Sequence, residues 1–191
     1  MRDSEEFSGG FWKRACSGGY RRLQKEMMIR DAQPGDIIFA LGKGIIEAVT
    51  FSNVRHVAIV YDKYTVFETD IWKRRAGFTS LMNYYDKDAE LWRADDVYET
   101  KVQELCNKYD KTPYSYLDIL TNLLTAPLHP KIRRKITAFI GNKYFMVCSE
   151  LSGKILYEAT KNPFLRDYES LQPIDLYRIF LHHPDLFKKI A

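Results

Sequence analysis

The chain has 191 residues, of which 46% are hydrophobic and 28% are charged, and its formal net charge is +4. This length suits one domain with a full hydrophobic core, and the composition is typical of a globular protein rather than a disordered one. The small positive excess tolerates anionic partners without requiring them, and the densest basic run, 131–135, alternates with apolar residues as on the solvent face of an amphipathic helix. The composition therefore argues against a dedicated nucleic-acid-binding protein.

The sequence carries no recognisable export signal and no membrane-spanning segment. Residues 1–10 are polar and acidic, and no apolar run approaches the roughly 18 residues that span a bilayer. Three widely spaced cysteines fit a reducing compartment, and no cluster of histidines or cysteines has the spacing of metal ligands. We therefore expect a cytoplasmic protein, or one encoded by a phage or virus, that uses no metal and no other cofactor.

The chain divides into an N-terminal extension at 1–32 and a domain at 33–191. The extension is basic and aromatic over 11–28, and a short helix is expected in its second half. A helix lying on a membrane surface is an alternative interpretation of the same segment, although two adjacent glycines interrupt it.

The first half of the domain has the pattern of β structure. Gln33 to Asp36 has the composition of a turn, and apolar or alternating segments of strand type follow it. We expect strands at 37–40, 56–61, 65–71 and 89–94, a hairpin turn at Asp62–Lys63, and one or two helical turns at 45–50.

From Glu99 onward the apolar spacing becomes that of helices. One apolar helix face is formed by Val102, Leu105, Cys106 and Tyr109. Further helices are expected at 115–125, at 131–140 and from about Cys148, with Leu151, Ile155 and Ala159 on one side of the last. Pro173 to Leu176 opens a final segment. Strands followed by helices indicate an α+β fold.

Cys148 is the strongest candidate for a nucleophile among the three cysteines. Cys106 lies in an apolar helix face, where a thiol acts as a small hydrophobic group, and Cys16 has cations nearby but nothing to hold a substrate. Cys148 comes where an apolar stretch ends and a helix begins, so the N–H groups of the helix start favour the thiolate and can hold an oxyanion. Glu150 in the same turn opposes this by raising the pKa of the thiol, and the sequence leaves the balance open.

His56 is the candidate base, because Glu68 lies in the next strand where a carboxylate would orient the imidazole and stabilise its charged form. The alternative is a hydrogen-bonded core histidine. The two side chains share a face only if an odd number of residues connects the strands. A loop over 61–63 places them directly opposite, and a loop of Asp62–Lys63 places them on opposite faces. The remaining histidines lie in loop or surface contexts: His129, His182 and His183.

Three segments in this order resemble a known family: Pro34 to Phe39, Arg55 to Val60 with Glu68 downstream, and Val147 to Leu151. They are similar to the circularly permuted NlpC-type papain-like hydrolases, most closely to the YiiX-like and YebB-like branch. The resemblance implies a small antiparallel sheet or barrel packed against helices, with a triad of Cys148, His56 and Glu68.

The resemblance covers residues 33 to 178. Thr112 to Ser115 looks like the Pro-Tyr segment of the family, and Pro173 to Leu176 looks like its closing turn. The chain lacks the Asn-Cys-Glu-His-Phe motif of the lecithin-retinol acyltransferase branch, so the lipid chemistry of that branch is less supported.

We therefore predict a cysteine hydrolase that cleaves an amide (peptide or isopeptide) or ester bond through a thioester on Cys148, with His56 as general base. Tyr114 and Tyr144 are candidates for binding the substrate or its oxyanion. The resemblance implies a peptide-like or acyl-lipid substrate. Two other functions stay open: a lipid acyltransferase or thioesterase whose segment 1–32 contacts a membrane, and a binding or structural module without catalysis.

Overall fold

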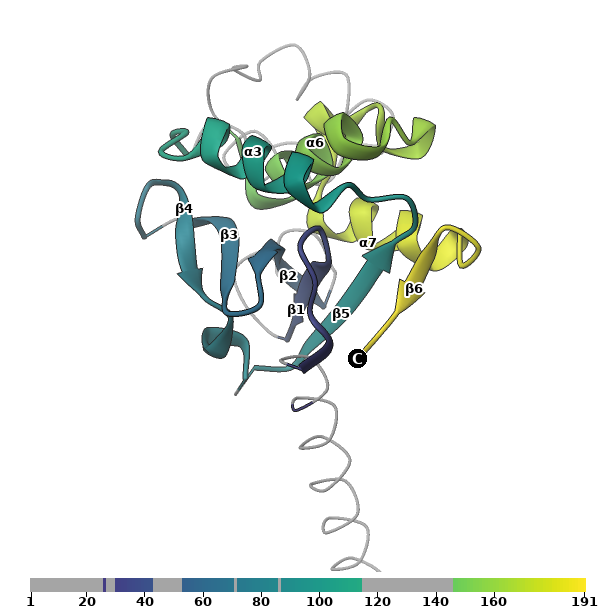
Figure 1. Cartoon of the computed structure of the whole chain (residues 1–191), viewed down its shortest axis with the longest axis horizontal. Coiled ribbons are helices and arrows are strands. Elements are labelled where there is room, and N and C mark those ends of the chain that lie inside the picture. The colour runs from purple at the N-terminus through teal and green to yellow at the C-terminus, as the bar shows by residue number, and fades with distance from the viewer. Residues whose placement is uncertain (1–25, 27–29, 43–52, 71, 86, 115–145) are drawn as a thin grey trace, which may run out of the picture.

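The computed structural model describes residues 26, 30–42, 53–70, 72–85, 87–114 and 146–191. This part of the chain is a mixed α and β structure, in which helices cover one face of an antiparallel sheet (Figure 1). The strands are β1 (Ile37–Leu41), β2 (Val54–Asp62), β3 (Thr65–Asp70), β4 (Arg75–Ser80), β5 (Ala89–Ala94) and β6 (Phe187–Lys189). The helices are α3 (Glu99–Tyr109), α6 (Cys148–Thr160) and α7 (Pro173–His182), with short 3-10 turns η1 (Leu81–Tyr84), η2 (Pro163–Leu165) and η3 (Tyr168–Ser170). The predicted α+β class is confirmed.

The sheet is open and has the strand order β4-β3-β2-β1-β5-β6, with every neighbouring pair antiparallel. Strands β2, β3 and β4 follow one another as hairpins. The chain then returns past β1, so that β5 pairs with β1 rather than with β4. This return places β1 and β2 in the middle of the sheet, beneath the helices.

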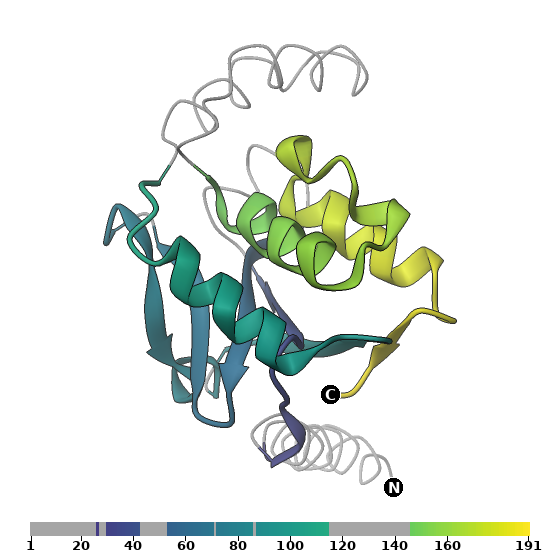
Figure 2. The same cartoon turned by 45° about the horizontal axis from the view of Figure 1, so that its top comes forward.

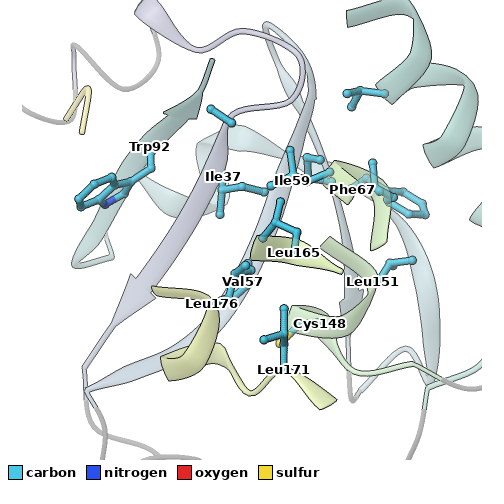
Figure 3. Close-up of a cluster of buried hydrophobic side chains, with 14 of the residues drawn as sticks. Ile37, Val57, Ile59, Phe67, Trp92, Cys148, Leu151, Leu165, Leu171 and Leu176 are labelled. Carbon is cyan, nitrogen blue, oxygen red and sulfur yellow. The ribbon is translucent and has the colours of Figure 1, made fainter. Parts of the chain in front are cut away.

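Both faces of the central strands are buried, which explains why β1 and β2 have nearly continuous apolar sequences. Along β1, Ile37 and Phe39 enter the core beneath the helices, whereas Ile38 and Ala40 enter a smaller core on the other face. Figure 3 shows the helix-side core, to which Cys148 belongs. The nucleophile candidate therefore lies at the main hydrophobic core.

Helices α3 and α6 bury the faces that their apolar spacing predicts. Helix α3 buries Val102, Leu105 and Cys106, and α7 begins at a proline, which suits the first helical position because that residue needs no N–H acceptor. In α6 the predicted face is buried through Leu151, Ile155 and Ala159. Among the residues that the structure describes, none forms a helix with the length and apolar character needed to cross a membrane.

All four predicted strands are present, with corrections at their ends. Strand β2 begins earlier, at Val54, and the hairpin turn lies at Lys63–Tyr64 rather than at Asp62–Lys63. Two strands were not expected, β4 and β6, because each is an edge strand with charged or small residues and little apolar alternation. The predicted helical segments at 45–50, 115–125 and 131–140, and most of the extension at 1–32, lie outside the described residues.

The predicted turn before β1 is present and is tied to β5. The Asp36 N–H donates to the Gln33 carbonyl at 3.0 Å, and Gly35 has a φ of +93°, as a type II turn requires. The buried Asp36 carboxylate accepts two N–H groups of Arg93, at 2.8 and 2.9 Å. A Cβ atom on Gly35 would lie 2.4 Å from Cγ1 of Val97, so both the backbone conformation and the close approach require glycine.

Gly35→Ala is expected to lower the free energy of unfolding by about 3 kcal/mol, because a left-handed backbone costs an L-residue about 1–2 kcal/mol and the contact with Val97 adds overpacking. Gly42→Ala is the matched control, since Gly42 also has a positive φ, +118°, but its Cβ would meet nothing within 4 Å among the described residues. Urea unfolding measures both losses. Equal losses would mean that Val97 moves aside at no cost.

Candidate active site

Cys148 is the first residue of α6 and is almost fully buried, with 2% of its surface exposed. Its helix begins after Val147, whose side chain has no oxygen to cap the first turn. Two polar contacts fix the helix start instead: Glu150 accepts the Val147 N–H at 3.2 Å, and the Ser149 hydroxyl donates to the Leu171 carbonyl at 2.5 Å. The sulfur is therefore held where the helix has its partial positive charge.

His56 on β2 forms a hydrogen bond with Cys148. Burial of the imidazole would lower its pKa, but the neighbouring Cys148 thiolate and the Glu68 carboxylate outweigh burial and raise the pKa of His56 to about 10. Nε2 of the ring lies 2.7 Å from Oε2 of Glu68, which leaves Nδ1 for the sulfur. The raised pKa favours the charged form of His56, which lies between the sulfur of Cys148 and the carboxylate of Glu68.

The pKa of Cys148 is lowered despite its burial. Burial alone would raise the pKa of the thiol, but the His56 imidazolium and the backbone N–H groups of Val57 and Ser149 stabilise the thiolate and lower it below the ordinary value. The net shift is downward even with the Glu150 carboxylate in the same helical turn, which answers the question that the sequence leaves open. The lowered pKa of Cys148 and the raised pKa of His56 together favour a thiolate–imidazolium pair.

Glu68 on β3 is held by three side chains and is only 10% exposed. It binds His56, accepts the Thr79 hydroxyl at 2.7 Å on Oε1, and accepts the Tyr84 hydroxyl on Oε2. Burial would raise the pKa of this carboxyl, but the bonds from His56, Tyr84 and Thr79 lower it to about 2. Sequence reasoning missed Thr79 and Tyr84, because a threonine and a tyrosine in an unrecognised edge strand and the turn after it give no signal of their own.

The expected contact between His56 and Glu68 is present, but the register differs from both loops considered. The pairs Ile59–Phe67 and Val60–Val66 place Glu68 beside residue 58, so it lies diagonally across from His56 on the same face. The two-residue turn alone would put them on opposite faces. A β-bulge between Val60 and Asp62 adds one residue to β2 and restores the shared face.

Of the other predicted site residues, the structure describes some and leaves others outside the described ranges. Tyr114 is buried, its N–H donates to the Arg74 carbonyl at 3.0 Å, and it forms a parallel bridge with Met146, two residues before Cys148. Tyr144 lies outside the described residues, as do His129 and Cys16. Burial raises the pKa of Cys106 to about 12, as suits a core thiol, and His183 stacks on Phe164 away from the site.

No group of three or more potential metal ligands occurs within the described ranges. No model of a known protein family matches the chain, and no curated protein matches it. The geometry of Cys148, His56 and Glu68 is therefore what indicates the chemistry of the site.

The thiolate–imidazolium pair predicts that Cys148 reacts with iodoacetamide below the ordinary pKa of a thiol. At about pH 6, His56→Ala is expected to slow alkylation of Cys148 about tenfold or more, because the thiolate loses its counter-charge. Peptide mass mapping assigns the modified cysteine, with Cys148→Ala as the blank. Equal rates in the wild type and His56→Ala would show that the imidazolium does not stabilise the thiolate.

The lowered pKa of Glu68 predicts a pH-dependent contribution to stability. A carboxyl with a pKa of about 2 in the folded state and about 4.5 in the unfolded state stabilises the fold above pH 4.5, and this contribution is lost as the pH falls towards 2. The difference in unfolding free energy between the wild type and Glu68→Gln should therefore narrow by about 2 kcal/mol from pH 7 to pH 3. Urea unfolding at each pH measures it, with Glu104→Gln as the surface control; a constant difference would contradict the assigned pKa.

Proposed function

We propose that this protein is a cysteine-dependent hydrolase that cleaves an amide or ester bond through a thioester on Cys148. The observation that carries the proposal is the hydrogen-bonded chain from Cys148 through His56 to Glu68, with the sulfur at the start of α6. A cysteine that only fills the core needs no such partners. Cys106 is a contrasting cysteine in the same chain, because burial raises the pKa of its thiol.

In the proposed first step the thiolate of Cys148 attacks the carbonyl carbon of the substrate. The oxyanion that forms faces the start of α6, where the backbone N–H of Cys148 belongs to a turn whose N–H groups have no acceptor within the helix. His56 then gives its proton to the leaving amine or alcohol as the carbonyl bond to that group breaks. The products of this step are the released group, a thioester on Cys148 and a neutral His56.

The second step consumes water and regenerates the site. Neutral His56 takes a proton from water while the water oxygen attacks the thioester carbonyl. The carbon–sulfur bond breaks, and the carboxylic acid product leaves the thiolate of Cys148 beside the protonated His56. The site returns to the charge state in which it began.

Glu68 acts in this mechanism as a positioning residue. Its carboxylate orients the imidazole through Nε2 and stabilises the charged form that the first step requires. Tyr84 and Thr79 hold the carboxylate in turn, so the base on β2 is supported from three other elements, β3, β4 and η1.

The circularly permuted papain-like fold is part of the same proposal. A nucleophile at a helix start, packed against an antiparallel sheet whose strand β2 carries the base, supports it. So does the chain order, in which the histidine strand precedes the cysteine helix. The proposed substrates are peptide-like amides or acyl lipids, because both contain the carbonyl group that the thiolate attacks.

Acyl transfer to the protein tests the proposal directly. p-Nitrophenyl acetate should acetylate Cys148, seen as a nitrophenol burst and as the mass of one acetyl group on its peptide. Cys148→Ala and His56→Ala are each expected to lower turnover at least about a thousandfold, because members of such a unit act together. Cys106→Ala is the control for removing a buried thiol elsewhere. Equal acetylation of Cys148 in the wild type and in His56→Ala would mean that Cys148 is only a reactive thiol. No acetylation would favour a binding module without catalysis.

A further inference from the structure

The loop that joins β3 to β4 combines an exposed indole with a run of cations. Trp72 is 88% exposed, and Lys73, Arg74 and Arg75 follow it with exposed side chains. We call these four residues the 72–75 loop. Among residues 70–75 the single acidic residue is Asp70, so the segment is strongly cationic. Water is a poor environment for a whole indole ring, whereas the headgroup level of a membrane suits its apolar body and polar N–H.

This loop is connected to the nucleophile by two steps of backbone pairing. The Arg74 carbonyl accepts the Tyr114 N–H at 3.0 Å, and the Pro113 carbonyl accepts the Met146 N–H at 3.2 Å. Adjacent extended chains lie about 4.8 Å apart, so the backbone of Met146 lies about 10 Å from that of Arg74. Figure 2 shows the β3–β4 loop, the chain after α3 and the entry to α6 side by side. The 72–75 loop is therefore joined through backbone pairing to the chain that leads into Cys148.

The same pairing argues against an added peptide strand as the partner of this loop. Strand β4 is at the edge of the sheet, where a peptide would add, but residues 112–114 already occupy its first residues. The Ala76 N–H donates to the Thr112 carbonyl at 2.7 Å, and Arg75 is paired with Pro113. The exposed side chains of the loop, one indole and three cations, complement an anionic lipid surface.

We propose that the 72–75 loop docks this protein on an anionic membrane surface and so presents Cys148 to acyl substrates held there. The presentation of substrate rests on the proposed function, but the docking does not, because Trp72 and the cations act without the thiolate. Backbone pairing through 112–114 connects the loop to the start of α6, so docking would orient the nucleophile as well as concentrate it at the surface.

Sedimentation with lipid vesicles tests the docking independently of catalysis. The full chain and its Cys148→Ala variant are mixed with phosphatidylcholine vesicles, or with vesicles in which phosphatidylglycerol is about one third of the lipid. Both proteins should bind the anionic vesicles at least about tenfold more tightly, and added salt should weaken the binding. If Cys148→Ala binds while the wild type shows no acetylation, the docking stands and the hydrolase proposal falls.

Matched variants locate the binding on the loop. Lys73→Gln with Arg75→Gln should weaken binding about thirtyfold, because each cation near an anionic surface contributes about one factor of five. Lys188→Gln with Lys189→Gln removes the same charge from β6 at the opposite edge of the sheet and should change binding less than about twofold. Trp72→Ala should also weaken binding, whereas Tyr98→Ala removes an exposed aromatic ring elsewhere and should not.

Three results would overturn the proposal. The first is no preference for anionic vesicles, and the second is equal losses from the loop and β6 variants, which would indicate general attraction to a basic protein. The third is tighter binding of polyglutamate than of vesicles through the same loop, which would make an acidic peptide the partner. Thermal unfolding of every variant confirms that the compared proteins are folded.

Discussion

A buried thiolate and a partly buried imidazolium stabilise each other only in contact, and this constraint governs the arrangement of β2 and α6. Either charge alone would be strongly disfavoured in the main core, where Cys148 has almost no contact with solvent. The pair is stabilised because α6 begins at the sulfur and because Val57 and Ser149 point their N–H groups at it. The helix start and the middle strand of the sheet therefore have to meet at one place.

The charge on His56 in turn depends on a polar network behind it. Glu68 has only 10% of its side chain exposed, and its charge is stabilised by a histidine, a threonine and a tyrosine that come from different elements. A network of this kind is stabilising only when each member has its partners. For the proposed chemistry, strand β4 and turn η1 are thus as necessary as β2, although they contribute no reacting group.

The backbone pairing around 112–114 connects the surface of the molecule to this network. It closes the edge of β4 and holds Met146, which leads directly into α6. The 72–75 loop and the start of α6 are therefore parts of one continuous structure joined by backbone pairing.

The sequence by itself determined the features that depend on local pattern. Apolar spacing predicted the buried face of α6, and the change from an apolar stretch to a helix predicted that Cys148 stands at its start. The strand-forming residues around His56 and Glu68 predicted two neighbouring strands. These features were readable because helices and hairpins arise from residues that are close along the chain.

Only the tertiary structure decided the rest of the site. Whether His56 and Glu68 share a face depended on one bulged residue near Tyr61, which the alternating pattern does not reveal. Thr79 and Tyr84 reach Glu68 from 11 and 16 residues away, and Arg74 is joined to Tyr114 across the sheet edge. Such contacts depend on strand register and on which strands become neighbours, and both are set by the packing of the whole domain rather than by any short segment.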